Sequence, residues 1–399
     1  MTRGDGPHLF PPGQGRGTPG SGSGTGEPPP VLPDYGGPCI ANLVPALLAP
    51  TPPPPWLPEP ARAEQVVLLV VDGLGWVQLQ EHKASVPTLA AAEAVRLSSV
   101  VPSTTATALT SLTTGLPPAR HGILGYRVRN GDDGVLNVLQ WTVRGRDMRR
   151  ELPAGAVQPL PPFLGRRVPV VTRTEFQLTG FSALHLGSCP QFGWRVPSTL
   201  VERCVQLVAT GEPFVYAYYD GIDKVSHEWG LGAEYRAELA AIDRLVGDLA
   251  ARLPAHAALV IVADHGQVSV EGPGLVPDSS VMSLTSLVSG EGRFRWLHAR
   301  PGKAADLAKV AADAFSEVAW VRTRDEIVEQ GWFGGVPGEQ ALARLGDVAL
   351  VAREPVAFLD PADIGESRLV GRHGSLTAAE MDVPLLVLRG QADSGNSCA

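Results

Sequence analysis

Three aspartates follow short apolar runs of this chain, at the points where buried strands would end. They are Asp72, Asp223 and Asp264, and His265 comes directly after the last of them. In open α/β sheets ligands bind beyond the carboxyl ends of the strands, so acids at several such ends converge in space. A single aspartate of this kind is better explained as a helix cap or a turn residue. The three together predict one site that binds cations.

Two further histidines add nitrogen ligands to this predicted site. Asp223 and His227 are four residues apart, a spacing that places both side chains on one face of a helix, where they can hold one ion. Taken alone, the pair is better explained as a solvent-exposed one. His373 precedes Gly374 in a loop before the last apolar run. Mixed imidazole and carboxylate ligands suit zinc.

A cluster of hydroxyl side chains fills residues 102–115, directly after the strand-like residues 97–101. Serine and threonine at a junction between strand and helix commonly cap the helix, and capping is one interpretation here. The second interpretation is catalytic. A hydroxyl beside a divalent cation can lose its proton at neutral pH, and the N-terminus of the helix favours an incoming phosphate.

Short apolar runs separated by helical stretches predict the elements that position these residues. Runs rich in Val, Ile and Leu are typical of buried strands in a mainly parallel sheet. They cover residues 66–71, 213–219, 259–263 and 383–388, and helices are expected at residues 105–114, closed by Gly115, and 233–253. The sequence therefore predicts an α/β layered fold, with helices flanking a central, mainly parallel sheet.

The chain is expected to hold one large domain with a tail and an insertion. Residues 1–36 are rich in Gly and Pro and are predicted to be a disordered tail, which leaves residues 37–399 for the catalytic domain. Residues from about 275 to 368 have a separate pattern of strand-like and helical segments, which predicts a small α+β insertion. Its expected parts are strands at 294–299 and 319–323, a helix at 304–315 and a hairpin at 347–358.

Composition excludes several classes of protein. A net charge of −8 argues against a basic surface that could bind a nucleic-acid polymer. No signal-like N-terminus and no run of about 18 apolar residues is present, so no contact with a membrane is expected. The four cysteines show no paired spacing, which fits a reducing compartment. We therefore expect a cytoplasmic protein with a small substrate and leave its oligomeric state open.

With these motifs in order, the chain resembles the alkaline phosphatase superfamily and, within it, the type I phosphodiesterase/nucleotide pyrophosphatase branch. Matching the ends of the hydroxyl segment, Thr-Gly-Leu116 and His121-Gly-Ile, places the branch's nucleophile on Thr105, with Thr104 as the alternative. The resemblance implies an alkaline-phosphatase-like fold and two divalent ions, most simply Zn²⁺, with Thr105 also a metal ligand. It assigns Asp72, Asp264 and His265 to one ion and Asp223, His227 and His373 to the other.

The implied activity is hydrolysis of phosphodiester or pyrophosphate bonds through a phosphothreonine, on a small phosphate-containing substrate such as a nucleotide. A phosphate monoesterase or phosphonate hydrolase on the same site is the alternative, and a non-catalytic binding protein is a third class. Where many members carry a phosphate-binding Asn, this chain has Tyr126, with Asn130 four residues later. Arg127 or Arg173 directed between the metals would favour a monoesterase. The Cys/Ser-x-Pro-x-Arg signature of sulfatases is absent.

Overall fold

The computed structural model describes residues 28–49, 52–270, 272, 274–363 and 365–392. Within this part of the chain, a seven-stranded sheet forms the centre of the molecule, with the strand order β2-β17-β10-β1-β9-β7-β8. The strands are β1 (Gln65–Val71), β2 (Glu93–Ser98), β7 (Val170–Arg173), β8 (Gln191–Trp194), β9 (Phe214–Tyr219), β10 (Ala257–Val262) and β17 (Asp382–Arg389). Every residue of β9 and β10 is buried, as expected of apolar strands covered on both faces.

The directions of the strands place their carboxyl ends at one edge. β10, β1, β9, β7 and β8 are parallel to one another, whereas β17 is antiparallel to both β10 and β2. The sheet is thus mainly parallel, but the run at 383–388 enters it antiparallel, because an apolar run carries no information about strand direction. The edge formed by the ends of β1, β9 and β10 carries the candidate site.

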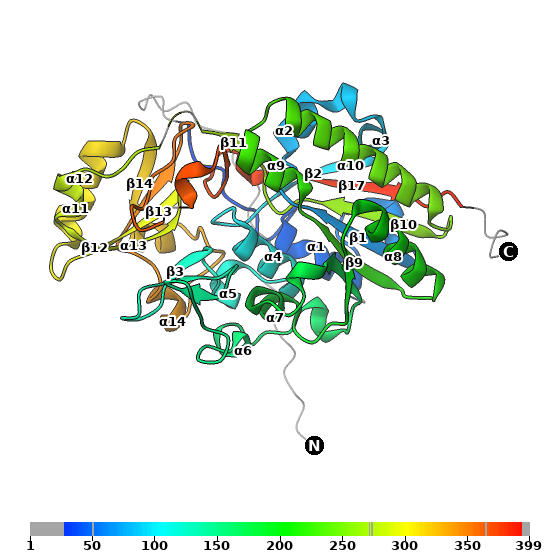
Figure 1. Ribbon diagram of the computed structural model, residues 1–399, viewed down its shortest axis with the longest axis horizontal. Coiled ribbons are helices and arrows are strands. Elements are labelled where there is room, and N and C mark those ends of the chain that lie inside the picture. The colour runs from blue at the N-terminus through cyan, green and yellow to red at the C-terminus, as the bar shows by residue number, and fades with distance from the viewer. Residues whose placement is uncertain (1–27, 50–51, 271, 273, 364, 393–399) are drawn as a thin grey trace, which may run out of the picture.

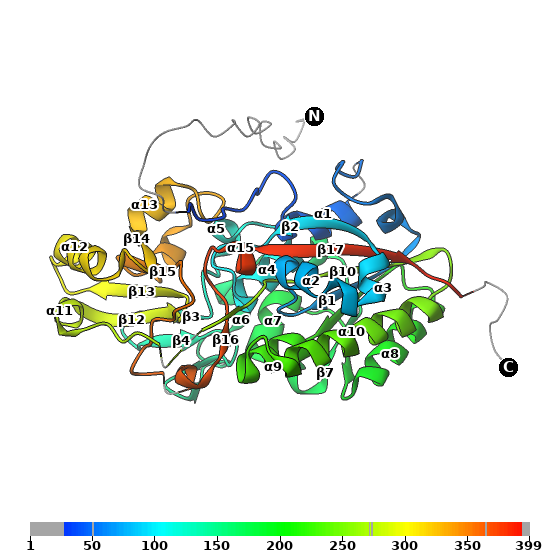
Figure 2. The same ribbon diagram turned by 90° about the horizontal axis from the view of Figure 1, so that it is seen from above.

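Helices cover both faces of this sheet. α8 (Pro197–Ala209) and α10 (Ala233–Arg252) lie on one side, and α1 (Leu43–Leu48) and α4 (Thr105–Thr114) lie on the other (Figures 1 and 2). α9 (Gly221–Trp229) follows β9 and borders the candidate site. The other helices of the layered part are α2 (Trp76–Glu81), α3 (Pro87–Ala91), α5 (Pro118–His121), α6 (Ala154–Val157), α7 (Gly180–Leu186) and α15 (Ala378–Met381).

The expected insertion forms an antiparallel sheet with the order β12-β13-β15-β14 beside the main layers (Figure 1). Its elements are α11 (Ser279–Met282), β12 (Thr285–Glu291), β13 (Phe294–Ala299), α12 (Ala304–Phe315), β14 (Ala319–Thr323), α13 (Arg324–Glu329), α14 (Glu339–Leu342) and β15 (Val348–Ala352). The predicted hairpin at 347–358 is wrong. β15 is fully buried and pairs with β13 and β14, so the pattern marked one central strand.

Two small sheets were not expected from the sequence. One joins β3 (Arg127–Arg129), β4 (Val135–Asn137), β5 (Thr142–Val143) and β6 (Arg146–Asp147), and the other pairs β11 (Val268–Ser269) with β16 (Gly371–Arg372). Both lie between the main sheet and the insertion (Figure 2). The first of them contacts the insertion through β3 and β12, and the second contacts α9 through β16.

Most of the predicted tail, residues 1–27, lies outside the described residues. Residues 28–36 are described and contact the folded body: the Val31 amide donates to the Leu376 carbonyl (2.9 Å), and the Trp320 indole donates to the Pro28 carbonyl (3.1 Å).

In the described part of the chain, no helix combines the length and apolar character needed to cross a membrane. The three cysteines within the described ranges are free and buried; they are Cys39, Cys189 and Cys204.

Candidate active site

Thr105 is the first residue of α4 and differs from three other threonines of that helix. Thr110, Thr113 and Thr114 donate to carbonyls one turn back in the helix, at 2.6–2.9 Å. The Thr105 side chain instead lies 3.1 Å, from Oγ1 to Nε2, from His265 and remains 8% exposed. Thr104 is the N-cap residue and makes no side-chain capping bond. Thr105 is therefore the hydroxyl that faces the predicted metal ligands, at a helix end that favours anions.

Asp72, Asp264 and His265 form one cluster because β1 and β10 are adjacent parallel strands. The His265 Nε2 atom is 3.3 Å from Asp72 Oδ1 and 3.4 Å from Asp264 Oδ2. All three side chains are buried, and within the described residues these two carboxylate oxygens accept no hydrogen bond. Tyr218 donates its hydroxyl to the other oxygen of Asp72.

Burial raises the pKa of Asp72 well above its usual range, and the charges of Asp264 and Asp223 raise it further. Burial likewise raises the pKa of Asp264, although neighbouring His265 lowers it in part. Carboxylates that lack partners and repel one another are costly to bury unless a cation joins them. This cluster therefore fits a divalent cation.

Asp223, His227 and His373 form a second cluster beside the first. Asp223 Oδ2 is 3.3 Å from His227 Nε2, and Asp223 Oδ1 is 3.7 Å from His373 Nε2. The Nδ1 atoms of the two histidines lie 2.7 Å from the Gly371 carbonyl and 2.9 Å from the Ser103 carbonyl. A carbonyl that accepts from Nδ1 leaves the Nε2 lone pair free for a metal.

The two clusters meet at His265 rather than standing apart. The rings of His265 and His373 stack with centroids 3.5 Å apart. Ligand atoms of Asp223, His265 and His373 lie within 4.8 Å of one another, as do those of Asp72, Asp264 and His265. The pKa of His373 is held well below its usual value by burial first and then by His265 and His227, which keeps the ring neutral and ready to bind a metal. His265 thus belongs to both groups of candidate ligand atoms.

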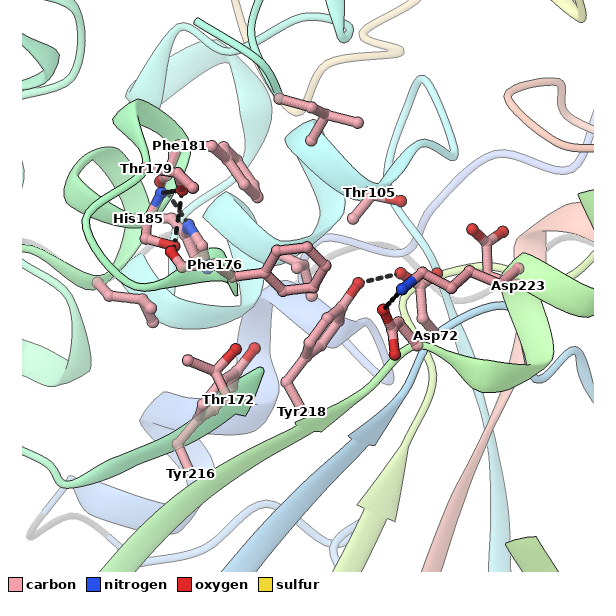
Figure 3. A pocket seen from close by; sticks show the side chains of 16 residues that line it. Asp72, Thr105, Thr172, Phe176, Thr179, Phe181, His185, Tyr216, Tyr218 and Asp223 are labelled. Carbon is pink, nitrogen blue, oxygen red and sulfur yellow. Dashed lines mark hydrogen bonds and ion pairs between the residues drawn. The ribbon is translucent and has the colours of Figure 1, made fainter. Parts of the chain in front are cut away.

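A largely apolar cavity of about 210 Å³ adjoins Thr105 on one side. Figure 3 shows Tyr218 reaching toward Asp72, with Phe176 beside it and Phe181 on the far wall. We call this the apolar cavity. Its aromatic walls suit a flat or hydrophobic substituent of a substrate.

A second cavity, of about 420 Å³, adjoins Thr105 and His373 on the side of the insertion. We call it the polar cavity. Its other lining residues include Tyr126, Asn137 and Glu291. Asn137 Oδ1 accepts from the Gln140 amide at 3.0 Å. Asn130, by contrast, lies in the turn between β3 and β4 and is not among the residues that line this cavity.

The arginines that would favour a monoesterase point elsewhere. Arg173 pairs with Asp220 (2.5 Å) and lies over the Trp194 ring. Arg127 is held by Asp360 at 2.8 Å and Asp363 at 2.9 Å. Neither guanidinium group is therefore directed between the two clusters. Asp220 also pairs with Lys224 (2.6 Å), which explains why it is not part of the metal clusters.

Sequence patterns missed several residues of the site. Gln267 donates to Asp223 Oδ1 at 2.5 Å and orients that carboxylate, and Tyr218 binds Asp72. Glu291 reaches the site from the insertion. Gln267 lies two residues beyond His265, and Tyr218 is the next-to-last residue of β9. Their positions close to the motifs could therefore have been predicted from the sequence. Nothing in the sequence around Glu291 connects it with the site.

Comparisons with known proteins give a matching family model and similar structures. A model of the family described as type I phosphodiesterase/nucleotide pyrophosphatase matches residues 66–206 and 198–376. The murine ectonucleotide pyrophosphatase/phosphodiesterase 5 has a similar structure, with a TM-score of 0.61 at 16% identity over 82% of this chain and 90% of that one. The human form gives 0.60 at 15% identity, over 83% and 90% of the two chains.

A phosphonoacetate hydrolase from Sinorhizobium meliloti, solved with phosphonoformate, gives a TM-score of 0.55 at 18% identity, covering 84% of this chain and 92% of that one. Comparison with curated proteins gives no match. The structural likenesses show a shared fold. The predicted alkaline-phosphatase-like α/β fold is thereby confirmed.

Proposed function

Because the chain belongs to the type I phosphodiesterase/nucleotide pyrophosphatase family of phosphoric ester hydrolases, we propose that it cleaves phosphodiester or pyrophosphate bonds through a phosphothreonine on Thr105. The observation that carries this proposal is the position of the Thr105 hydroxyl. It lies at the N-terminus of α4, 3.1 Å from His265 Nε2, where the two ligand clusters meet. A nucleophile placed beside metal ligands and a helix end is suited to attack on phosphorus.

The ligand sets support two divalent ions, with zinc the best match to mixed oxygen and nitrogen donors. Asp72, Asp264 and His265 would hold one ion, and Asp223, His227 and His373 the other. Bound there, such ions supply charge neutralisation and Lewis acidity to the phosphate and to the attacking oxygens.

The side chain of Thr105 and the backbone amides of α4 carry out the remaining steps. Deprotonated Thr105 forms a bond from Oγ1 to phosphorus while the bond to the leaving alkoxide or phosphate breaks in line. The free amides at the start of α4 stabilise the charge that builds up on the phosphate oxygens. Water then attacks the phosphothreonine, and the bond between phosphorus and Thr105 breaks to release a monoester.

A diester or pyrophosphate substrate is favoured over a simple monoester. A monoester dianion carries an additional charge, which usually requires an additional cation. Arg127 and Arg173, the two candidates from the sequence, are engaged by aspartates. Arg372 and Lys224, which line the two cavities, lie beside Glu366 and Asp220. The apolar cavity can take a nucleoside or another substituent, and AMP is bound in a structure of an inactive form of the murine relative. A phosphonate hydrolase is the second candidate, supported by the likeness to phosphonoacetate hydrolase.

Two model substrates test the proposal. Protein freed of metal by chelation is reconstituted with zinc, its metal content is measured, and kcat/KM is determined for bis-p-nitrophenyl phosphate and p-nitrophenyl phosphate. We expect two zinc ions per chain and a higher kcat/KM for the diester. A higher value for the monoester would support the monoesterase instead. Two bound metals with no turnover of either ester would argue for a binding protein.

A further inference from the structure

Glu291 is a buried carboxyl of the polar cavity that has no role in the proposed chemistry. It is the last residue of β12, at the tip of the hairpin that β12 forms with β13. It lines the same cavity as Thr105 and His373 and is 4% exposed. Among the described residues, neither of its carboxyl oxygens has a hydrogen-bond partner.

Gly374 makes room for this side chain, and Gly125 lies within van der Waals range of it. A Cβ atom on Gly374 would lie 2.6 Å from Glu291 Cγ, and one on Gly125 would lie 3.4 Å from Glu291 Oε2. Both glycines have positive φ, 125° and 142°, a conformation that other residues rarely adopt. Gly374 follows His373, and Gly125 precedes Tyr126. The loop that carries His373 is therefore shaped around the Glu291 side chain.

Two neighbouring carboxylates of this cavity are already paired with arginines. Asp363 is 2.9 Å from Arg127, and Glu366 pairs with Arg295 and lies 3.6 Å from Arg372. Glu291 has no such partner within the described ranges. Burial raises the pKa of its carboxyl to about 8, an effect that Arg295 and the neighbouring Tyr126 backbone reduce and Glu366 increases. A buried carboxyl without a partner is stabilised by an incoming cation.

Building on the proposed function, we propose that Glu291 and Tyr126 recognise a positively charged amino or ammonium group on the substrate, carried by an ester substituent of the phosphodiester. Tyr126 lines the same cavity, and an aromatic ring beside a carboxylate suits an organic cation. A further metal ion would need several free oxygen ligands, but Asp363 and Glu366 are occupied by arginines. Thr105 lines the cavity too, so a short linker between phosphate and amine suffices.

A matched pair of esters tests this specificity. The p-nitrophenyl 2-aminoethyl and p-nitrophenyl propyl phosphodiesters have nearly the same shape and differ in the terminal charge. For the zinc-loaded wild-type protein we expect kcat/KM to favour the aminoethyl ester by about tenfold, the factor that 1.4 kcal/mol of added binding gives. The nearly isosteric variant Glu291→Gln should reduce this ratio to about one.

Binding and a control variant separate recognition from a structural role. The dissociation constants of both esters, measured by calorimetry with the Thr105→Ala protein, should show the same preference without turnover. Glu317→Gln, which changes an exposed glutamate of the insertion, should leave the ratio as in the wild type. Equal use of both esters by the wild-type protein, or a preference that persists in Glu291→Gln, would overturn this inference while leaving the proposed function intact. Failure to hydrolyse either ester, despite bound zinc, would instead count against the proposed function.

Discussion

Replacing Thr105 with alanine should abolish hydrolysis while leaving the protein folded and able to bind metal. The Thr105 side chain contributes one hydrogen bond, to His265, and does not cap its helix. Loss of that bond costs about 0.5–1.5 kcal/mol, and loss of the methyl group adds about 1 kcal/mol. The expected loss in the free energy of unfolding is therefore about 1–3 kcal/mol, which a domain of this size can tolerate.

The catalytic effect should be much larger than the effect on stability. Without a nucleophile, kcat should fall by at least about a thousandfold, which corresponds to roughly 4 kcal/mol of lost transition-state stabilisation. Thr105→Ser keeps the hydroxyl and should retain measurable activity. The assay is turnover of bis-p-nitrophenyl phosphate at saturating zinc, with urea unfolding and metal analysis of each variant. Undiminished turnover by the alanine variant would refute the assignment, and Thr104→Ala would then be the next variant to measure.

Three further predictions concern stability. Arg293→Met should lower the free energy of unfolding in urea by about 3–5 kcal/mol, because it leaves Glu380 buried without its partner at 2.7 Å; no loss would mean that the pair does not anchor the insertion. Because the pKa of Glu291 is raised, its protonated carboxyl contributes to the free energy of unfolding. This contribution is full below the ordinary pKa of 4.5 and is lost as pH rises through the raised pKa of about 8. Metal-free wild-type protein should thus lose more stability between about pH 5 and pH 8 than Glu291→Gln, and equal losses would contradict this. Adding zinc to the metal-free protein should raise Tm, and an unchanged Tm would argue against the metal clusters.

The parts of the fold that depend on local patterns were predictable. Apolar runs predicted β1, β9 and β10, and the acids that follow β1 and β10 lie together because those strands are parallel neighbours. The helix at 105–114 begins and ends as its hydroxyl and glycine pattern predicts. Each of these features is set by residues close together in the chain.

Features that depend on how distant segments pack could not be predicted. The antiparallel direction of β17 follows from its position beside β10, and the apolar run itself is compatible with either direction. Glu291 lies near the catalytic residues because the insertion docks against them, partly through the buried pair of Arg293 and Glu380. The stacking of His265 on His373, which joins the two ligand clusters, brings together residues that are far apart in the sequence.

The most direct test of the central claim is the anomalous-scattering map of zinc-loaded crystals, measured above and below the zinc absorption edge. The account predicts two zinc peaks about 4 Å apart, the separation usual for two-metal hydrolases. One peak should contact Asp72, Asp264 and Thr105, and the other Asp223, His227 and His373, with His265 bound to the first ion. A single peak at full zinc occupancy, or two peaks with His373 outside both coordination shells, would contradict it.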